Sequence, residues 1–298
     1  MIESIFRTVG GRASQRVFGT ALVTTVSLGA ALGAWSLHDG GNLVARSAQW
    51  LTARSGLERG LVTAAALVGV TLVSLIVLGL VPPVLRLLQG YWPAWLEFVR
   101  WRLVRRVTKA ADRDGEEMQE LGREHRTDAR LDRRLRQLPS TAEWYMPTRL
   151  GNVMRAAQSR PIDKYGLDPV TIWPHLFLVM PETTQKEIIA AANALERAVT
   201  VVLCSLLFVV LGPWVWWAAP LGVAVAVLLQ RTIVHTAAGT HAELVEAAID
   251  LHRLDLYRKL SWPLPTNPAE ERELGEQLLS YLKYGSDSTE PTFTSGKP

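Results

Sequence analysis

Three uncharged stretches divide this chain into apolar and polar parts. The longest, Ala198–Gln230, has thirty-three residues without a charged side chain, whereas one helical membrane crossing needs roughly 20 apolar residues. Gly212-Pro213 interrupts it near the middle, and three tryptophans follow the break. Because tryptophan gathers at membrane–water interfaces, the pattern predicts two crossings joined by a very tight turn.

Two further uncharged stretches, Val17–Leu37 and Gly60–Leu85, predict the first two crossings, the second ending at Pro82-Pro83. Val17–Leu37 is longer than the core of a secretory signal, roughly 7–15 residues, so we expect it to be retained. The predicted fold is all-α: a polytopic membrane protein with four transmembrane helices in two hairpins and a helical cytoplasmic domain. The expected divisions are a cytoplasmic N-terminus (1–16), a first transmembrane hairpin (17–90) with an external loop at about 38–60, a cytoplasmic helical domain (91–190), a second hairpin (191–235), cytoplasmic C-terminal helices (236–284) and a disordered tail (285–298).

The arginines predict the orientation. Arg7, Arg12 and Arg16 precede the first crossing, and positive charge stays on the cytoplasmic side, so both termini and the middle domain are expected in the cytoplasm. Tyr91–Lys109 mixes tryptophan with basic residues, which is typical of a helix leaving the membrane through the anionic headgroup layer. RNA binding is the alternative interpretation, disfavoured by the position beside a crossing. The residues expected to contact headgroups are Arg102, Arg105 and Lys109.

Small and hydroxyl side chains recur at helical spacing inside the crossings. Thr20, Thr24 and Ser27 share one face of the first crossing. They could line a pore, or they could bond to their own helix carbonyls and pack against other helices. Small residues let helix backbones approach closely, and the predicted packing seams are Gly29 with Gly33 and, in the fourth crossing, Ala218, Gly222 and Ala226.

Local signals place the polar helices. Leucines near a seven-residue rhythm in Asp112–Leu138 predict a helix packed on a partner, or a solvated helix with one apolar stripe. Thr184-x-x-Glu187 reads as a capping box that starts a helix running straight into the third crossing. Thr148 is expected to cap a helix over Arg149–Ser159, and Pro161 to end it. Two further helices are expected to begin at Pro169, capped by Asp168, and at Pro268, capped by Asn267.

The segment from Leu150 to Leu176 resembles a known pattern. Leu150-Gly151-Asn152, Arg155-Ala156-Ala157, Tyr165-Gly166-Leu167-Asp168 and Trp173-Pro174-His175-Leu176 are similar to a motif in a family of uncharacterised bacterial integral membrane proteins. Members of that family more often carry an acid where this chain has Gln158, and arginine where it has His175. The resemblance covers about thirty residues closely. It implies a bacterial inner-membrane protein and brings no biochemical activity, and the two departures would matter if those positions formed an ion pair.

Composition and motifs argue against an enzyme. The chain is 48% hydrophobic and 20% charged, with a net charge of +4. Arginines flanking the membrane crossings account for this positive charge, so it does not indicate nucleic-acid binding. It has no glycine-rich phosphate loop, GxSxG elbow, metal-ligand spacing or paired carboxylates in an apolar setting. We therefore expect no catalytic, cofactor or metal site. His235, His241 and His252 are expected as surface histidines, and the lone Cys204 as a small apolar side chain.

Two functional hypotheses follow. The first is an oligomeric membrane channel or membrane-permeabilising effector controlled by its cytoplasmic domain, which rests on the hydroxyl stripe and the small-residue seams. The alternative is a membrane anchor or scaffold whose cytoplasmic domain binds a protein partner, which rests on the Leu150–Leu176 motif and the apolar side of the last helix. Crossings without any ionisable side chain argue against ion-coupled transport. A homo-oligomer is expected under the first hypothesis.

Overall fold

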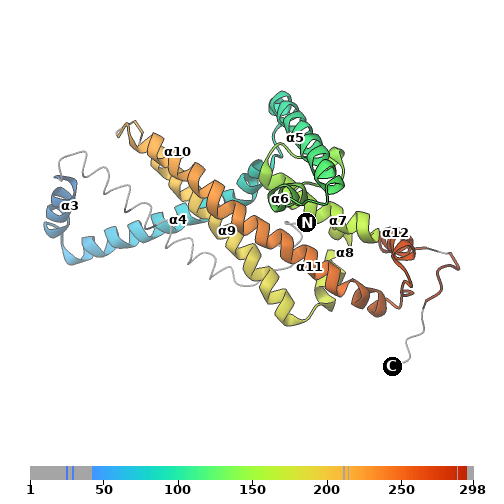
Figure 1. The fold of residues 1–298 in the computed structure, drawn as a ribbon. Helices are drawn as coiled ribbons and strands as arrows, with labels where there is room; N and C mark the ends of the chain where they lie inside the picture. Colours follow the sequence, from blue (N-terminus) through green and yellow to red (C-terminus); the bar gives the residue numbers. More distant parts are fainter. Residues whose placement is uncertain are drawn as a thin grey trace. The chain divides into compact units, whose positions relative to one another are not determined.

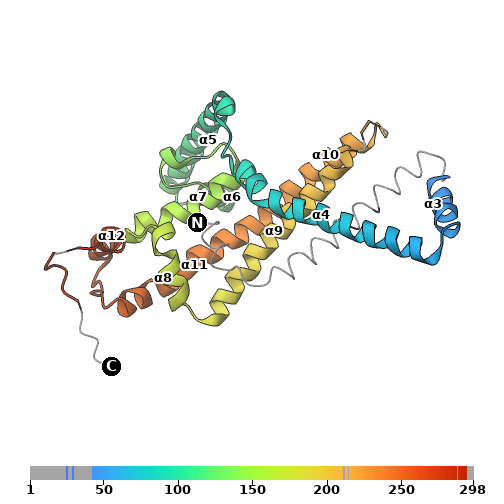
Figure 2. The same ribbon diagram turned by 180° about the vertical axis from the view of Figure 1, so that it is seen from behind.

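The computed structural model describes Thr25, Gly29 and residues 42–210, 212–213, 215–286 and 288–293. Every regular element within these residues is a helix (Figures 1 and 2). Most of the stretch expected to form the first crossing lies outside them. The elements are α3 (Asn42–Thr52), α4 (Gly56–Gln89), η1 (Ala94–Leu96), α5 (Glu97–Arg123), α6 (Ala129–Arg136), η2 (Ala142–Trp144), α7 (Arg149–Tyr165), α8 (Pro169–Val179), α9 (Glu182–Val210), α10 (Ala218–Leu229), the π-helical turn η3 (Gln230–Val234), α11 (His235–Lys259) and α12 (Pro268–Tyr284).

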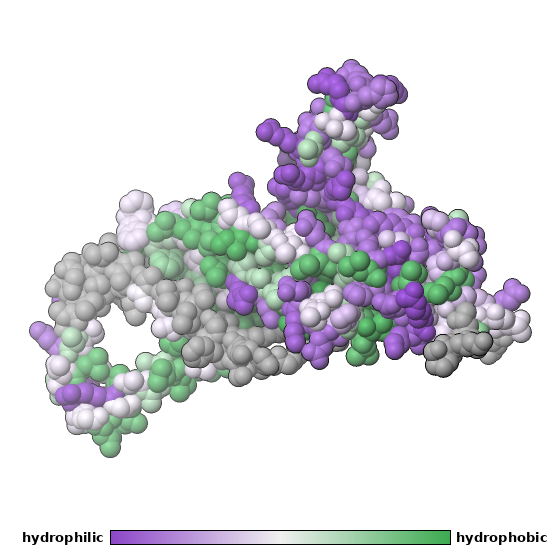
Figure 3. Space-filling model, turned by 60° about the horizontal axis from the view of Figure 1, so that its bottom comes forward, coloured by the Kyte–Doolittle hydropathy of each residue, from purple (hydrophilic) through white to green (hydrophobic). Residues whose placement is uncertain are grey.

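Three helical stretches in the described chain are long and apolar enough to cross a membrane: Gly56–Arg123, Glu182–Val209 and Ala218–Lys259. The apolar part of the first is α4. Large hydrophobic side chains remain exposed along α4 and α10, among them Leu67 at 64% and Leu228 at 61%, and Figure 3 shows hydrophobic residues gathered on the surface of this part of the chain. Such a surface is stable in contact with lipid and not with water, which supports association with a membrane.

The chain divides into two compact units. The apolar unit includes α3, α4 as far as Leu85, and Ala194–Thr236, which contains the end of α9, α10 and η3. The polar unit includes Arg86–Asn193 and Ala237–Pro298, which contain α5 to α8, the start of α9, and α11 and α12. Two helices therefore belong to both units, because α9 and the continuous α10–η3–α11 helix extend from one into the other.

Close backbone contact holds α9 and α10 together within the apolar unit. Ala218, Gly222 and Ala226 are the buried residues of α10. A Cβ atom on Gly222 would lie 2.9 Å from both the Cβ of Phe208 and the carbonyl oxygen of Ser205 on α9, so only glycine fits there. The seam expected from sequence thus lies against the neighbouring helix of the same chain.

Hydroxyl groups in the apolar helices bond back to their own helix. Thr71 Oγ1 donates to the Leu67 carbonyl at 2.8 Å, Ser74 Oγ to Val70 at 2.7 Å, and Thr200 Oγ1 to Glu196 at 2.9 Å. Each bond spans four residues, the usual arrangement for Ser and Thr in apolar helices. These hydroxyls are satisfied without water or a permeating ion.

α4 continues through both prolines, which corrects the expectation that the second crossing ends at Pro82-Pro83. The helix ends at Gln89, where Gly90 has φ +97°. There the Tyr91 N–H donates to the Arg86 carbonyl and the Gly90 N–H to the Leu87 carbonyl, both at 3.0 Å. This is the Schellman pattern, and it ends α4 seven residues after Pro82.

The helix expected over Tyr91–Lys109 begins later and runs further. Its first turn is the 3₁₀ helix η1, and α5 then extends from Glu97 to Arg123. The single rhythmic helix expected over Asp112–Leu138 is also wrong, because His125 takes φ +55° and the chain reverses into α6. α6 packs against α5 and buries Leu131, so this apolar stripe is covered within the chain.

Side-chain caps start three helices of the polar unit, as the sequence predicts. Thr148 accepts the Gly151 N–H at 3.0 Å, Asp168 the Val170 N–H at 3.1 Å, and Asn267 the Glu270 N–H at 3.0 Å. The expected box at Thr184 is wrong, because α9 already begins at Glu182 and Thr184 lies inside its first turn.

Pro161 does not end α7, which continues to Tyr165 and closes at Gly166 in the left-handed conformation, φ +65°. Proline removes one helical hydrogen bond. Arg160 and Lys164 lie on either side of Pro161 and both pair with Glu246 of α11, and these tertiary contacts stabilise the helix beyond the proline.

α12 docks on the end of α7 through two glycines. A Cβ on Gly275 would overlap the Tyr165 carbonyl oxygen, and a Cβ on Gly166 would overlap the Arg272 carbonyl oxygen. The helices can approach so closely because neither residue has a side chain. The contact closes the core of the polar unit, in which Trp173, Leu176, Ile249, Tyr257 and Leu278 are fully buried.

In the described part of the C-terminal tail, one side chain, Phe293, contacts aromatic rings at this core. The ring of Phe293 lies 6.0 Å from the rings of both Trp262 and Tyr281. Aromatic pairs at this separation attract one another.

Two glycine substitutions test the α7–α12 contact. We expect Gly275→Ala to destabilise the polar unit by about 1–3 kcal/mol, because the added methyl group has no room beside the Tyr165 carbonyl. Gly239→Ala on α11 is the matched control: nothing lies within 4 Å of its Cβ position, so it should be neutral or stabilising by up to about 1 kcal/mol. Thermal unfolding in detergent compares the two, and equal effects would contradict the close approach.

Candidate functional site

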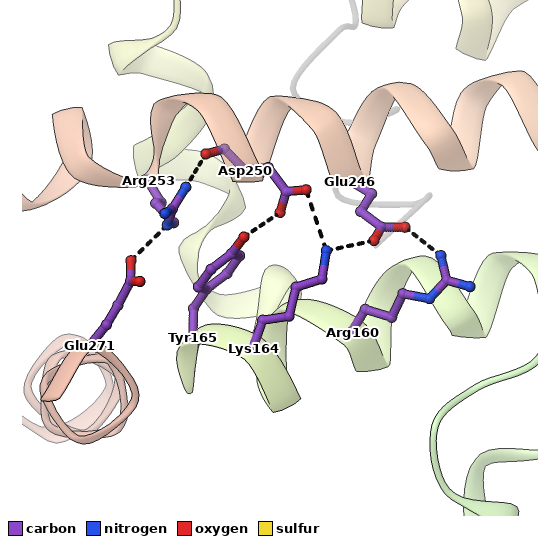
Figure 4. A network of polar contacts seen from close by, with 7 residues as sticks. All are labelled: Arg160, Lys164, Tyr165, Glu246, Asp250, Arg253 and Glu271. Carbon is purple, nitrogen blue, oxygen red and sulfur yellow. Dashed lines mark hydrogen bonds and ion pairs between the residues drawn. The ribbon is translucent and has the colours of Figure 1, made fainter. Parts of the chain in front are cut away.

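A network of ion pairs joins α7 to α11 (Figure 4). Glu246 accepts from Arg160 Nη1 at 2.7 Å and from Lys164 Nζ at 3.0 Å. Lys164 also approaches Asp250 at 3.4 Å, and the Tyr165 hydroxyl donates to Asp250 at 2.8 Å. The two carboxylates lie four residues apart on α11, and the two cations lie four apart on α7, so both pairs share a helix face.

Arg253 extends the network to α12. Its Nε donates to Glu271 at 2.6 Å and its guanidinium lies 4.2 Å from the centre of the Tyr165 ring. Another of its nitrogens donates to the Asp250 carbonyl. Glu271 is 10% exposed and Arg253 21%, so this pair is desolvated and holds α12 against α11.

The electrostatics of the network are those of paired ions. Burial alone would lower the pKa of Lys164, but the hydrogen bond to Glu246 and the charges of Glu246 and Asp250 outweigh it, and the pKa is raised. Burial also raises the pKa of Tyr165, as does its hydrogen bond to Asp250. Both groups keep their protons at neutral pH, which suits a structural clamp better than a proton carrier.

The network forms one wall of an open groove of about 490 Å³. Arg160 and Lys164 are engaged by Glu246, and the third cation of the lining, Arg136, pairs with Asp132 at 2.9 Å. The lining residues are Leu135, Arg136, Leu138, Pro139, Ser140, Tyr145, Arg160, Lys164 and Glu246.

The first part of the Leu150–Leu176 motif packs the polar unit from inside. Leu150 is 1% exposed. A Cβ on Gly151 would overlap the carbonyl oxygen of Gln89, the last residue of α4. The Asn152 side chain accepts the Met146 N–H at 2.7 Å and donates to the Met146 carbonyl at 3.0 Å. These residues fix the end of α4 and the chain before α7.

Arg155 and Gln158 contact each other. Arg155 Nη1 donates to Gln158 Oε1 at 3.2 Å, and the guanidinium lies 4.9 Å from the Trp144 ring centre and 5.8 Å from that of Tyr91. His175 is exposed on α8. The partner of position 158 is therefore Arg155, and an acid at this position would form its ion pair there.

The second part of the motif turns the chain from α7 into α8. Gly166 permits the close crossing with α12, and Asp168 caps α8 and also accepts from Thr171 Oγ1 at 2.7 Å. Trp173 is fully buried, whereas Pro174 is exposed inside α8. The motif as a whole positions helices and presents no reactive group.

The expected headgroup surface lies on the first half of α5. Arg102, Arg105 and Lys109 are all exposed there, and the Arg105 guanidinium lies 4.0 Å from the centre of the Trp101 ring. Trp95 and Phe98 are exposed at 79% and 67%. Cations and aromatic rings therefore meet solvent side by side.

The remaining predicted residues lie in the apolar part of the chain. Thr20, Thr24, Ser27 and Gly33 fall outside the described residues. Gly29 is helical, and no atom of the described residues lies within 4 Å of its Cβ position.

His241 is buried, which corrects the expectation of a surface histidine. It is 0% exposed, and neither ring nitrogen has a hydrogen-bond partner. Burial lowers its pKa to about 4, because the charged form cannot be solvated there. His252, in contrast, approaches Asp255 at 3.4 Å.

Sequence reasoning missed the network of α7, α11 and α12. Glu246, Asp250 and Arg253 follow a spacing of four and three on α11, the signal of one helix face. Their partners on α7 lie more than eighty residues away in the sequence. No sequence pattern near those partners indicates the pairing.

The described residues contain no group of three or more His, Cys, Asp and Glu side chains placed to hold a metal ion. Comparisons with protein-family models, with curated proteins and with solved structures find no match to this chain.

Removing one carboxylate tests the clamp. We expect Glu246→Gln to destabilise the polar unit by about 2 kcal/mol, because Arg160 and Lys164 lose their charged partner in a half-buried site. Glu182→Gln is the control, since Glu182 pairs with Lys186 at the surface, where such pairs contribute roughly 0–1 kcal/mol. Chemical denaturation measures both, and a loss of less than about 0.5 kcal/mol for Glu246→Gln would argue against the clamp.

His241 predicts a pH dependence. Its folded pKa of about 4 lies below the ordinary value of 6.5, so the unfolded chain binds a proton that the folded chain rejects. Stability should therefore be unaffected above pH 7 and fall by about 3 kcal/mol as the pH drops from 6.5 to 4. Unfolding midpoints between pH 4 and 8 measure this, and His241→Leu should remove that part of the slope. An unchanged slope in the variant would contradict the burial of a neutral imidazole.

Proposed function

We propose that this protein is a membrane-anchored scaffold whose polar unit binds a protein partner. The observation that carries the proposal is the surface of α8. This helix is apolar on two faces, and only one of them is buried. Ile172, Trp173 and Leu176 lie in the core, whereas Val170 and Leu178 are exposed at 46% and 79%.

The exposed face of α8 forms a stripe. Val170, Pro174 and Leu178 are four residues apart, so they share one side of the helix. An apolar stripe at this spacing is a common contact surface for a partner helix or groove. We define the stripe by these three residues.

Helix continuity supports an anchoring role. α9 and the α10–η3–α11 helix each contain an apolar stretch long enough to cross a membrane and then enter the core of the polar unit without a loop. Ile188 of α9 and Ile249 of α11 are fully buried in that core. Two helices shared by the apolar unit and the polar unit suit a platform anchored at a membrane surface.

The proposal places the polar unit in the cytoplasm of a bacterial cell, with the protein in the inner membrane and both termini inside. Its support is the arginine distribution along the chain and the preference of positive charge for the cytoplasmic side. The partner is then a cytoplasmic protein, and no nucleic acid is involved.

A charge on the stripe tests the scaffold. We expect Leu178→Asp to reduce co-purification of a cytoplasmic partner at least tenfold, since an interface that buries a leucine gains roughly 1.5–3 kcal/mol from it. Leu251→Asp on α11 is the matched control, because Leu251 is exposed to a similar extent, 73%.

Quantitative mass spectrometry of cross-linked membranes compares the captured proteins. Partners retained by the control and lost by Leu178→Asp support the proposal. Capture of this protein alone, or equal loss in both variants, would reject it. Trp173→Ala is unsuitable as a test, because Trp173 is buried and its removal would disturb the fold.

A channel formed by a homo-oligomer is the second candidate. The observation that favours it is the π-helical turn Gln230–Val234, where the apolar helix passes into α11, since such turns often mark functional positions. The proposed pore lining is Thr20, Thr24 and Ser27. Liposomes containing the protein should then carry an ion current that Thr24→Leu changes, and electrically silent bilayers at high protein density would exclude the channel.

A further inference from the structure

A groove of about 390 Å³ opens between the start of α5 and η2. Its chemistry differs from that of the basic surface beside it, because acids and aromatic rings dominate. The lining residues are Glu97, Phe98, Arg100, Trp101, Val104, Glu143 and Tyr145.

The charges of the groove are close to balanced. Glu97 and Glu143 contribute two negative charges and Arg100 one positive charge, and Arg100 approaches Glu97 at 3.6 Å. The surplus cations of α5, Arg102 and Arg105 among them, do not line it, although the Arg105 guanidinium lies 4.0 Å from the ring centre of the lining residue Trp101. A purely anionic ligand would meet two carboxylates here and be repelled by at least one of them.

The aromatic rings favour a cation. Phe98 and Trp101 are exposed at 67% and 53% and line the groove together with Tyr145. An ammonium group is attracted to the faces of such rings, and carboxylates add charge-assisted hydrogen bonds. The guanidinium of Arg100 suits the opposite end of the ligand, a phosphate. The ligand that meets all three conditions carries an ammonium and a phosphate a few atoms apart.

The position of the groove along the chain points to a lipid. α4 closes at Gln89, and Glu97 begins α5 only eight residues later. In the membrane-anchored protein proposed above, the groove lies within reach of the headgroup layer. Trp95, also exposed, precedes it as an interfacial aromatic residue.

We propose that this groove binds the headgroup of a phospholipid that carries a primary ammonium, such as phosphatidylethanolamine. The ammonium lies against Phe98 and the face of Trp101 that Arg105 does not cover, between Glu97 and Glu143, and the phosphate faces Arg100. The exposed cations of α5 outside the groove contact anionic lipids without selecting one headgroup. The inference rests on the membrane anchoring proposed above.

The test uses the full-length protein in nanodiscs of phosphatidylethanolamine and phosphatidylglycerol in equal amounts. After transfer to the gas phase, native mass spectrometry counts the lipids of each kind that stay bound. We expect phosphatidylethanolamine to be enriched, and the double variant Glu97→Gln, Glu143→Gln to reduce the enrichment roughly five- to tenfold. Trp101→Leu should act in the same direction.

Two controls separate the groove from general surface effects. Glu116→Gln with Glu117→Gln makes the same change of charge on exposed residues of α5 far from the groove, and Trp95→Leu removes an exposed aromatic residue that does not line it. Both should leave the enrichment unchanged. Equal losses in the groove variants and the controls, or a wild-type preference for phosphatidylglycerol, would overturn the inference.

Membrane partition distinguishes this inference from the proposed function. A protein that fractionates with membranes but shows no phosphatidylethanolamine enrichment leaves the anchor in place and rejects the groove site. A protein that stays in the soluble fraction rejects both.

Discussion

The backbone of α12 crosses the end of α7 so closely that neither Gly166 nor Gly275 can carry a side chain. Most of the polar unit depends on this approach. It brings Glu271 to Arg253, closes the core over Trp173 and Leu278, and leaves the Tyr165 hydroxyl facing Asp250. This contact tolerates little variation, because a side-chain atom added at either glycine must displace the backbone of the other helix.

Local chemistry in the sequence predicted the helix starts well. Thr148, Asp168 and Asn267 cap their helices because a short polar side chain before an apolar run needs only its own backbone. The helix ends were harder to predict. Pro161 was expected to end α7 and does not, since the pairing of its neighbours with α11 outweighs one lost hydrogen bond. Tertiary contacts decide such cases, and they are not visible in a window of sequence.

The candidate site shows the same limit. The Leu150–Leu176 motif stood out in the sequence because it resembles a known pattern. The structure uses these residues to pack helices. The ion pairs between α7 and α11 went unnoticed, because ordinary charged residues more than eighty positions apart form them. The burial of His241 was not predicted for a related reason: whether a helix face is buried depends on the elements that pack against it.

The length of α8 has a consequence for how the chain is inserted. With eleven residues and a rise of about 1.5 Å for each, α8 reaches about 16 Å, roughly half of a hydrocarbon core of about 30 Å. Although its sequence is strongly apolar, α8 is too short to serve as a stop-transfer segment. A helix of this length does not reach across a bilayer, so the segments before and after it, α7 and the start of α9, would lie on one side of a membrane. The length of α8, and not its polarity, is what keeps it from crossing a membrane.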